Sequence, residues 1–403
     1  MAAGNDSTAQ TPGARCDVLV IGGGVCGLWT LHTLRDAGFN AWLVERSALG
    51  DGQTIASQGI LHAGTKYDLP GNAADASEAV AAVQPIWEDA LAGRSLPGVP
   101  DLSAAKCLAR ETVYWTRNTI GSRIAAEGAK RTLRTTLKKL PRERWPLGFE
   151  QAPRGVKVYR APETVLEPGS LLNAMRHRVE ARARVGRVQS IEHDETGVRI
   201  RLASGPSVSC SAVVLCAGEG NESLIDLAGG DGSALMQRRP LHQLVAAGTP
   251  FPLNGHCLKL DLDKPELTVT TGELGGLQTW YFGGGPAEEG VGRSPEAQIE
   301  AGKAAVSRSL PWVDQASFSW RVFEIDRAEG RQPDGKRPNE AVVEWAGERV
   351  MAAWPTKLVL APRAAGLVLK RLRDRGITPG VEAGRGSDGL DGLPEAPVAA
   401  RVW

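Results

Sequence analysis

Residues 17–46, DVLVIGGGVCGLWTLHTLRDAGFNAWLVER, constrain the fold more than any other part of the chain. An apolar run leads into three glycines with the spacing Gly22-x-Gly24-x-x-Gly27, and a helical pattern follows. A second apolar run then ends at Glu45. Strand, glycine turn, helix and strand in this order are typical of a βαβ unit that binds a dinucleotide. We therefore predict a Rossmann-like domain with a pyrophosphate at the helix N-terminus.

The residues of this unit have separate tasks. Gly22 permits the tight turn, Gly24 lets the backbone approach the pyrophosphate, and Gly27 lets the helix pack on the strand. Glu45, 18 residues beyond Gly27, is placed to accept hydrogen bonds from an adenosine ribose. The alternative is a glycine turn that only joins a strand to a helix.

Length and composition limit the class of protein. A chain of 403 residues favours two joined domains, and a net charge of +1 gives no electrostatic case for nucleic acid as a partner. No apolar run approaches the roughly 20 residues of a membrane-spanning helix. Six scattered cysteines without a CxxC pair predict neither a disulfide framework nor a metal site, so a cytoplasmic location is expected.

The order of helical and strand patterns predicts an α/β fold whose nucleotide domain is interrupted twice. Alternating apolar and polar positions over 237–285 indicate an antiparallel sheet, which gives the second domain an α+β character. We assign 16–75, 155–235 and 345–377 to the nucleotide domain. Residues 76–154 and 236–344 are assigned to a substrate or cap domain. Residues 1–15 are expected to be a flexible leader and 378–403 an irregular tail.

Four segments resemble the D-amino-acid oxidase superfamily of FAD-dependent oxidoreductases. They are the glycine turn with Glu45, SQGILHAGTKY (57–67), SAVVLCAGEGNESL (211–224) and WPTKLVLAP (354–362). The second and fourth are most similar to glycerol-3-phosphate dehydrogenases and L-2-hydroxyglutarate oxidases, although Trp354 and Pro355 replace paired glycines. The resemblance implies FAD as the cofactor. The presence of only one complete GxGxxG also argues against a separate NAD domain.

The resemblance also implies which residues bind FAD. Gly22, Gly24 and Gly27 would bind the pyrophosphate, and Glu45, beside Arg46, the ribose. The remaining positions follow the cofactor from its adenine to its flavin end: Val188, Ala217, Gly218, Ser57, Gln58, Thr356, Lys357 and Leu358. Lys357 could stabilise negative charge on the reduced ring, and the alternative is a solvated lysine that follows a strand.

Two histidines are candidates for the base that removes a proton from the substrate. His62 is the first, because the matching position in related enzymes faces the flavin, and it could instead hold the ring or the loop in place. His242 is the second, on a strand that in the family crosses the substrate cavity. For His242 the alternative is a structural histidine whose hydrogen bonds are made within the sheet.

Substrates of the family are usually anions, and a buried anion needs an arginine or a lysine. Arg321, Arg327 and Arg331 compete for this role, in the place of the family's glycine-arginine-proline turn. We favour Arg321, because an unpaired charge on an apolar strand would be costly without a function.

These observations predict an FAD-dependent dehydrogenase or oxidase. It would transfer a hydride from a small anionic 2-hydroxy acid or polyol phosphate to flavin N5, and pass electrons to oxygen, a quinone or a carrier protein. One alternative is an amino-acid or amine oxidase of the same superfamily, and another is a non-catalytic flavin-binding accessory protein. A third is an NAD-linked dehydrogenase. The basic run 130–145 is either a solvated face or a peripheral contact with a membrane or redox partner.

Overall fold

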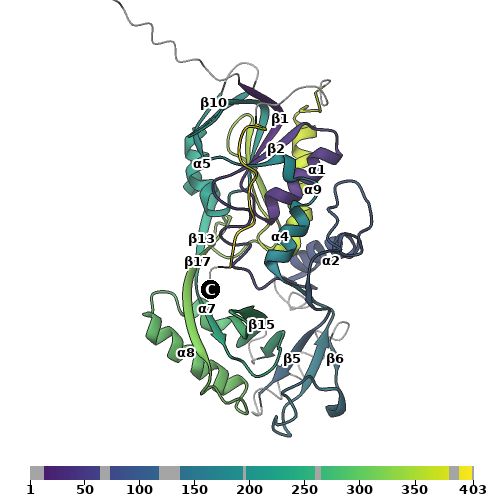
Figure 1. Ribbon diagram of the computed structural model, residues 1–403, viewed down its shortest axis with the longest axis vertical. Coiled ribbons are helices and arrows are strands. Elements are labelled where there is room, and N and C mark those ends of the chain that lie inside the picture. Colours follow the sequence, from purple (N-terminus) through teal and green to yellow (C-terminus); the bar gives the residue numbers. More distant parts are fainter. Residues whose placement is uncertain are drawn as a thin grey trace, which may run out of the picture.

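The computed structural model describes residues 13–63, 73–117, 137–193, 197–258, 265–380 and 390–401. It has two domains, one above the other in Figure 1, and the long strands β13 (Met236–Ala247) and β17 (Ser319–Gly330) lead from the upper domain into the lower one. The upper domain is built on a largely parallel sheet and the lower one on a largely antiparallel sheet. This mixed α/β architecture confirms the predicted fold class.

The upper, parallel-sheet domain is centred on β1 (Ala14–Ile21), which pairs in parallel with β2 (Ala41–Glu45) and with β12 (Val208–Leu215). Parallel pairs extend the sheet to β9 (Ala183–Val185) beside β2 and to β19 (Val350–Trp354) beside β12. Antiparallel strands complete its described part: β10 (Val188–His193), β11 (Val198–Leu202) and β18 (Val342–Trp345).

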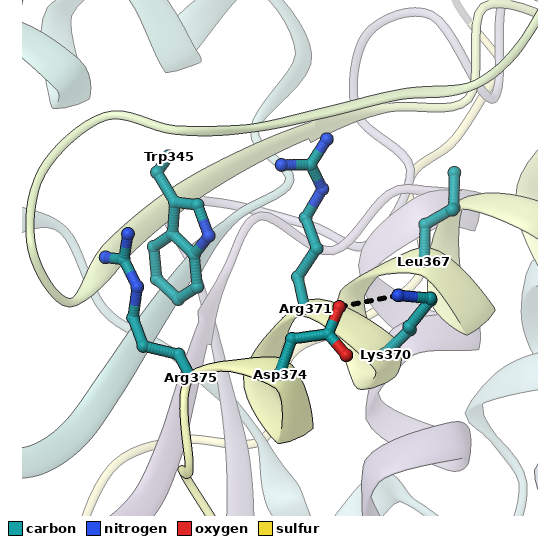
Figure 2. Close-up of a pocket in the computed structure, with 6 residues that line it drawn as sticks. All are labelled: Trp345, Leu367, Lys370, Arg371, Asp374 and Arg375. Atoms are coloured by element: carbon teal, nitrogen blue, oxygen red, sulfur yellow. Dashed lines mark hydrogen bonds and ion pairs between the residues drawn. The ribbon is translucent and has the colours of Figure 1, made fainter.

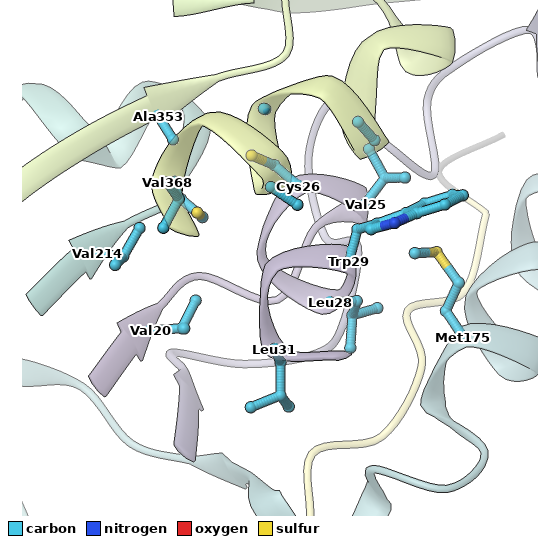
Figure 3. Packing of buried hydrophobic residues seen from close by; sticks show 14 of the residues in the cluster. Val20, Val25, Cys26, Leu28, Trp29, Leu31, Met175, Val214, Ala353 and Val368 are labelled. Carbon is cyan, nitrogen blue, oxygen red and sulfur yellow. The ribbon is translucent and has the colours of Figure 1, made fainter. Parts of the chain in front are cut away.

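Helices pack on both faces of this sheet. Val18 and Val20 of β1 point into a core formed with most of the helices, whereas Leu19 and Ile21 point into a second core on the other face, as the two-residue period of a strand requires. Leu224 and Ile225 of α5 belong to this second core. Figure 3 shows α1 (Val25–Asp36) next to α9 (Ala361–Asp374), with Cys26 of α1 and Val368 of α9 on the same side of the strands that carry Val20, Val214 and Ala353. The helices of this domain are α1 (Val25–Asp36), α2 (Ala73–Leu91), α4 (Pro168–Arg176), α5 (Asn221–Leu227) and α9 (Ala361–Asp374). No helix within the described ranges is long and apolar enough to cross a membrane.

The lower, antiparallel-sheet domain has the strand order β17-β13-β16-β15-β14-β5-β7-β6. Its remaining strands are β5 (Thr112–Thr116), β6 (Lys138–Lys139), β7 (Val158–Ala161), β14 (Gly255–Leu258), β15 (Leu267–Leu274) and β16 (Leu277–Gly283). One face packs on α8 (Pro295–Ser309), with Leu244 and Trp280 in the same core as Val306. The short helices α6 (Gly232–Leu235) and α7 (Gly285–Glu289) flank β13.

A small three-stranded sheet lies at the junction of the two domains. It consists of β3 (Ile60–Leu61), β8 (Thr164–Leu166) and β4 (Cys107–Ala109), in the order β3-β8-β4. Strand β8 follows β7 after two residues, and β3 precedes the segment that contains His62. This sheet therefore pairs β3, which comes from the parallel-sheet domain, with β8, which comes from the antiparallel-sheet domain.

Three segments pack in the other domain than the one to which the sequence analysis assigned them. Helix α2 packs into the core of the parallel-sheet domain through Val83 and Trp87, because its apolar face meets α1 and α9. Strand β7 pairs with β5 in the lower sheet, and β18 pairs with β19 in the upper one. The tail segment 390–401 forms an isolated bridge between Val398 and Leu49.

Replacing Trp87 with Phe tests how α2 is held. The Trp87 indole N–H donates to the carbonyl oxygen of Val359 at 2.8 Å, and both groups are buried. The substitution leaves that carbonyl without its donor, so the free energy of unfolding should fall by about 1–3 kcal/mol in chemical denaturation. Trp320→Phe is the matched control, because the Trp320 indole nitrogen has no hydrogen-bond partner among the described residues. Equal losses in both variants would contradict this account.

Candidate cofactor and substrate site

A cavity of about 1080 Å³ lies between the two domains. Its walls include the glycine turn after β1, the end of β2, the ends of β12 and β19, and one face of β13, β16 and β17. This volume is at the upper end of the range of small-molecule sites. The cavity is therefore large enough for an extended cofactor with a substrate beside it.

The glycine turn forms the floor of the cavity at the start of α1. Gly22 has a φ of +105°, and a Cβ on it would lie 2.5 Å from the Cα of Ala217. A Cβ on Gly27 would overlap the carbonyl oxygen of Gly22, so neither position tolerates a side chain. Gly23, Gly24 and the first residues of α1 line the cavity, and no side chain of the N-cap residue covers the helix end. This end offers N–H groups and a partial positive charge to an anion.

Glu45 stands beside this turn at the end of β2. Its carboxylate accepts the backbone N–H of Gly23 at 2.7 Å and that of Ser47 at 3.2 Å. Burial raises the pKa of Glu45, although these hydrogen bonds oppose the shift. Val188 and Gly218 line the same part of the cavity, and Arg46 is exposed and 3.7 Å from Glu219.

The turn after β19 forms a second end of the cavity wall, two strands away from the glycine turn. Thr356 has a φ of +61°, which is unusual for a β-branched residue, and its hydroxyl donates to the carbonyl oxygen of Glu340 at 2.9 Å. The next residue, Lys357, is buried in the cavity wall. Burial, together with the nearby charge of Arg337, lowers the pKa of Lys357 to about 7. This end therefore carries a cation whose charge depends on what occupies the cavity.

The loop 56–58 forms the side wall between these two ends. The Gln58 amide donates to the carbonyl oxygen of Tyr281 at 3.0 Å, and the Tyr281 hydroxyl donates to the carbonyl oxygen of Ala56. Burial raises the pKa of the Tyr281 hydroxyl far above its usual range. Tyr281 therefore stays a neutral donor that ties strand β16 to this loop.

His62 lines the cavity next to Gln58, and a buried carboxylate lies behind it. The His62 Nδ1 is 3.1 Å from Oε1 of Glu163, whose side chain is inaccessible to solvent. The second carboxylate oxygen of Glu163 accepts hydrogen bonds from Thr112 and Tyr114 and lies 3.4 Å from Nε2 of His256. The His62 ring is itself 25% exposed, so it connects this buried cluster to the cavity.

Strands β13 and β17 form a further part of the cavity wall. Leu241 and Gln243 come from β13, and Ile325 and Arg327 come from β17. The Arg327 guanidinium donates to Glu288 at 3.0 Å and to the carbonyl oxygen of Arg239 at 3.2 Å. Gln243 is buried, and its Oε1 has no hydrogen-bond partner within the described part of the chain. Such an acceptor is suited to a donor on a ligand.

The structure brings most of the predicted residues together around the cavity. Those in its wall are Gly22, Gly24, Glu45, Arg46, Ser57, Gln58, His62, Val188, Ala217, Gly218, Thr356, Lys357 and Leu358. Gly27 lies behind the turn, where it lets α1 pack against β1. Residues 130–136 of the basic run fall outside the described residues.

His242 and two of the three candidate arginines are not in the wall. Along β13 the side chains alternate, so His242 faces away from the cavity, with its Nδ1 3.1 Å from the carbonyl oxygen of Gly290. Arg321 is exposed and lies six residues before Arg327 on β17, roughly 20 Å by the rise of a strand. Arg331 is exposed and donates to the carbonyl oxygen of Ser233. Arg327 is therefore the arginine of this group that reaches the cavity.

Four further residues of the site were not found from the sequence. They are Glu163, His256, Gln243 and Arg337. Glu163 lies in the connection between β7 and β8, His256 lies on β14, and the two carry no shared motif. A weak signal was present in Thr112 and Tyr114, two polar side chains at alternate positions of a buried strand, which indicates a polar partner on that face.

A second pocket, of about 380 Å³, lies on the surface between α9 and β18 (Figure 2). Arg375 stacks on Trp345 with its Cζ 3.8 Å from the ring centroid, and Lys370 pairs with Asp374 at 2.6 Å. Arg371 pairs with Glu344 at 3.3 Å. Two of the three basic residues in this pocket pair with carboxylates, and the third stacks on an indole. Because these charges already have partners, the larger cavity is the better candidate for a functional site.

Comparison with known proteins agrees with this choice. A profile of the FAD dependent oxidoreductase (DAO) family matches residues 17–381. The chain is 35% identical over 392 residues to the probable FAD-dependent oxidoreductase PA4991 of Pseudomonas aeruginosa. The aligned residues cover 96% of this chain and 97% of that protein. The crystal structure of PA4991 superposes with a TM-score of 0.79, at 32% identity, and covers 97% of this chain and 98% of that one.

More distant structures share the fold. Glycine oxidase from Geobacillus kaustophilus has a TM-score of 0.64 at 14% identity, with coverage of 92% of this chain and 100% of that one. L-α-glycerophosphate oxidase from Mycoplasma pneumoniae, solved with FAD bound, also has a TM-score of 0.64, at 15% identity, with coverage of 89% and 95%. At this level of identity the likeness concerns the fold and not the substrate.

Replacing Lys357 with Met tests the electrostatics of the cavity. Because the pKa of Lys357 falls from 10.5 to about 7 on folding, the unfolded chain binds more protons between these pH values. Stability should therefore rise with pH across this window in the FAD-free wild type. The variant should lack that rise, so its gain in melting temperature should be greatest near pH 6 and vanish above about pH 10.

The matched control for this experiment is Lys370→Met, at an exposed lysine paired with Asp374. Its effect on the melting temperature should be small at every pH. A Lys357→Met curve parallel to that of the wild type would show that Lys357 is fully charged in the folded protein.

Proposed function

This chain belongs to the FAD-dependent oxidoreductase (DAO) family, and we propose that it oxidises a small anionic substrate carrying a hydroxyl group, such as a 2-hydroxy acid or a polyol phosphate. The protein is an FAD-dependent oxidoreductase, as the sequence predicted. FAD, when bound, supplies the acceptor of the substrate hydride. The choice of substrate rests on the residues around His62 and Arg327.

The described residues fit FAD at both ends of the cavity. The absence of side chains at Gly22 and Gly24 leaves room for a pyrophosphate at the start of α1, and Glu45 lies where a ribose would reach its carboxylate. Lys357 is placed at the other end, where a cation can stabilise negative charge on a reduced isoalloxazine. We assign Ser57, Gln58, Thr356 and Leu358 to the contacts between these two ends.

The observation that carries the substrate proposal is the position of His62 between the cavity and Glu163. The pKa of Glu163 lies well below its usual range, so its carboxylate is ionised and can only accept a hydrogen bond. Nδ1 of His62 therefore carries the proton, and a neutral ring has its lone pair on Nε2. Such a ring can take the proton of a substrate hydroxyl. An amine can lose its proton before oxidation, so a base held in this way favours a hydroxyl substrate.

We assign the anion of the substrate to Arg327. Two of its nitrogens are held by Glu288 and by the backbone of Arg239, and a guanidinium has five N–H donors, so it can bind a further acceptor without losing this support. Gln243 faces the same space and offers its Oε1 to a donor on the substrate. These two residues would orient the carbon that is oxidised.

Oxidation of an amino acid is the second candidate. The buried Oε1 of Gln243 can accept a hydrogen bond from an amine as readily as from a hydroxyl. Glycine oxidase is among the proteins with this fold. The electron acceptor, a cytoplasmic location and a membrane contact through 130–145 stay predictions from the sequence.

The visible spectrum of the FAD-loaded protein, recorded without oxygen, distinguishes the two candidates. We expect pooled 2-hydroxy acids or polyol phosphates to bleach the flavin band, and resolution of the active pool then identifies the substrate. Bleaching by amino acids alone would overturn the hydroxyl proposal in favour of the second candidate.

Single substitutions test the two assigned roles. His62→Gln should lower the rate of flavin reduction by about 10²- to 10⁴-fold, and the exposed His177→Gln should leave it unchanged. Arg327→Lys should raise KM about tenfold or more, with a smaller effect on kcat. The reason is that a lysine cannot keep the ion pair with Glu288 and also make two parallel hydrogen bonds to an anion. Arg321→Met serves as its control. A larger effect at Arg321 than at Arg327 would contradict the assignment.

A further inference from the structure

Glu163 and His62 face each other across the small sheet at the domain junction. Strands β3 and β8 are antiparallel, with Ile60 opposite Val165 and Leu61 opposite Thr164. The next position in that register places His62 opposite Glu163, and their side chains meet at 3.1 Å. The contact between an imidazole of the cavity wall and a buried carboxylate is therefore set by strand pairing.

The carboxylate of Glu163 is held on both oxygens. Oε2 accepts the hydroxyls of Thr112 at 2.6 Å and Tyr114 at 3.0 Å, and His256 Nε2 lies 3.4 Å away. Burial alone would raise the pKa of Glu163, but the contacts with His256 and His62 outweigh burial and hold it well below its usual range. Glu163 is thus an ionised group with a fixed orientation.

His256 supports this arrangement from the opposite side. Its Nδ1 lies 2.9 Å from the Thr268 hydroxyl, and its ring packs against Tyr114 with centroids 4.7 Å apart. A Thr268 hydroxyl that donates to Nδ1 leaves the proton of His256 on Nε2, directed at Glu163. The cluster is then satisfied with both imidazoles neutral.

We propose that Glu163 is a positioning residue that holds His62 in the tautomer with its lone pair on Nε2, and that His256 anchors this carboxylate. The inference rests on the proposed function, in which His62 is the base. When the O–H bond of the substrate breaks, its proton forms a bond with Nε2. The resulting imidazolium lies beside the Glu163 carboxylate and is stabilised by its charge.

A metal ion is the competing explanation for this cluster. One ligand atom each from His62, Glu163 and His256 lie within 4.8 Å of one another. The hydrogen bonds to both carboxylate oxygens account for the cluster without an ion, but carboxylates that ligate a metal are hydrogen-bonded as well. Metal analysis of the purified protein therefore decides between the two.

The direct test is the tautomer of His62, read by long-range ¹H–¹⁵N NMR of the FAD-loaded protein with ¹⁵N-labelled histidine. The chain has six histidines, and His62→Gln identifies the signals of His62. In the wild type we expect an N–H at Nδ1 and an unprotonated Nε2 at alkaline pH. If Glu163→Gln does not fold, this wild-type spectrum decides the proposal alone.

Glu163→Gln should reverse the tautomer. The donors Thr112, Tyr114 and His256 all face Oε2, so the amide oxygen of the glutamine takes that place and its NH₂ faces His62. Nδ1 must then accept, and the proton moves to Nε2. Glu266→Gln is the matched control, at a carboxylate paired with Arg117 and Arg308 and outside the cavity wall. It should leave the His62 signals unchanged.

Kinetics separate this inference from the proposed function. With a substrate that reduces the flavin, Glu163→Gln should lower the reduction rate about 10²- to 10⁴-fold while KM changes only a few-fold. A reversed tautomer without a loss of rate would support the positioning role and overturn His62 as the base. An unchanged His62 tautomer in Glu163→Gln, or one equivalent of metal bound in the wild type, would overturn the inference itself.

Discussion

The close approach of the backbone at Gly22 to the end of β12 is the contact on which the rest of the structure depends. The N–H of Cys216 donates to the carbonyl oxygen of Ile21 at 2.7 Å, and the missing Cβ of Gly22 leaves space for Ala217. Because Gly27 also lacks a side chain, α1 starts directly over this pair of strands. We assign the opening between the strand ends and the helix end to the cofactor.

The part of the cavity that we assign to the substrate depends on the way the chain passes between the domains. β13 and β17 leave the parallel-sheet domain and form the wall opposite the glycine turn, with Gln243 and Arg327 facing inward. The small sheet at the domain junction brings His62, which follows β3, next to Glu163, which precedes β8. The chemically useful groups therefore gather where the domains meet, although few of them are close in sequence.

The protonation states of the charged groups around the cavity depend on the balance between burial, which favours the neutral form, and ion pairing, which favours the charged form. Glu163 is buried with several donors and stays ionised, whereas Lys357 is buried beside another cation and its pKa falls to about 7. Arg327 is paired with Glu288 but keeps further donors. In the proposed function, His62 accepts a proton, the guanidinium of Arg327 binds an anion, and Lys357 is a cation whose charge changes near neutral pH, all within a single cavity.

Local patterns in the sequence were sufficient for the features that depend on neighbouring residues. The glycine spacing, the strand that ends at Glu45 and the segments 57–67 and 354–362 predicted the βαβ unit, FAD and most of the residues that line its cavity. Strand pairing was beyond such patterns: it turned His242 away from the cavity, left Arg321 at the far end of β17, and placed β7 and β18 in other sheets than expected. The packing of α2 on α1 and α9 was equally beyond them. Glu163 and His256 meet His62 only because strands distant in sequence pair side by side. Contacts of this kind are decided by tertiary packing, since no local signal in the chain encodes which strand faces which.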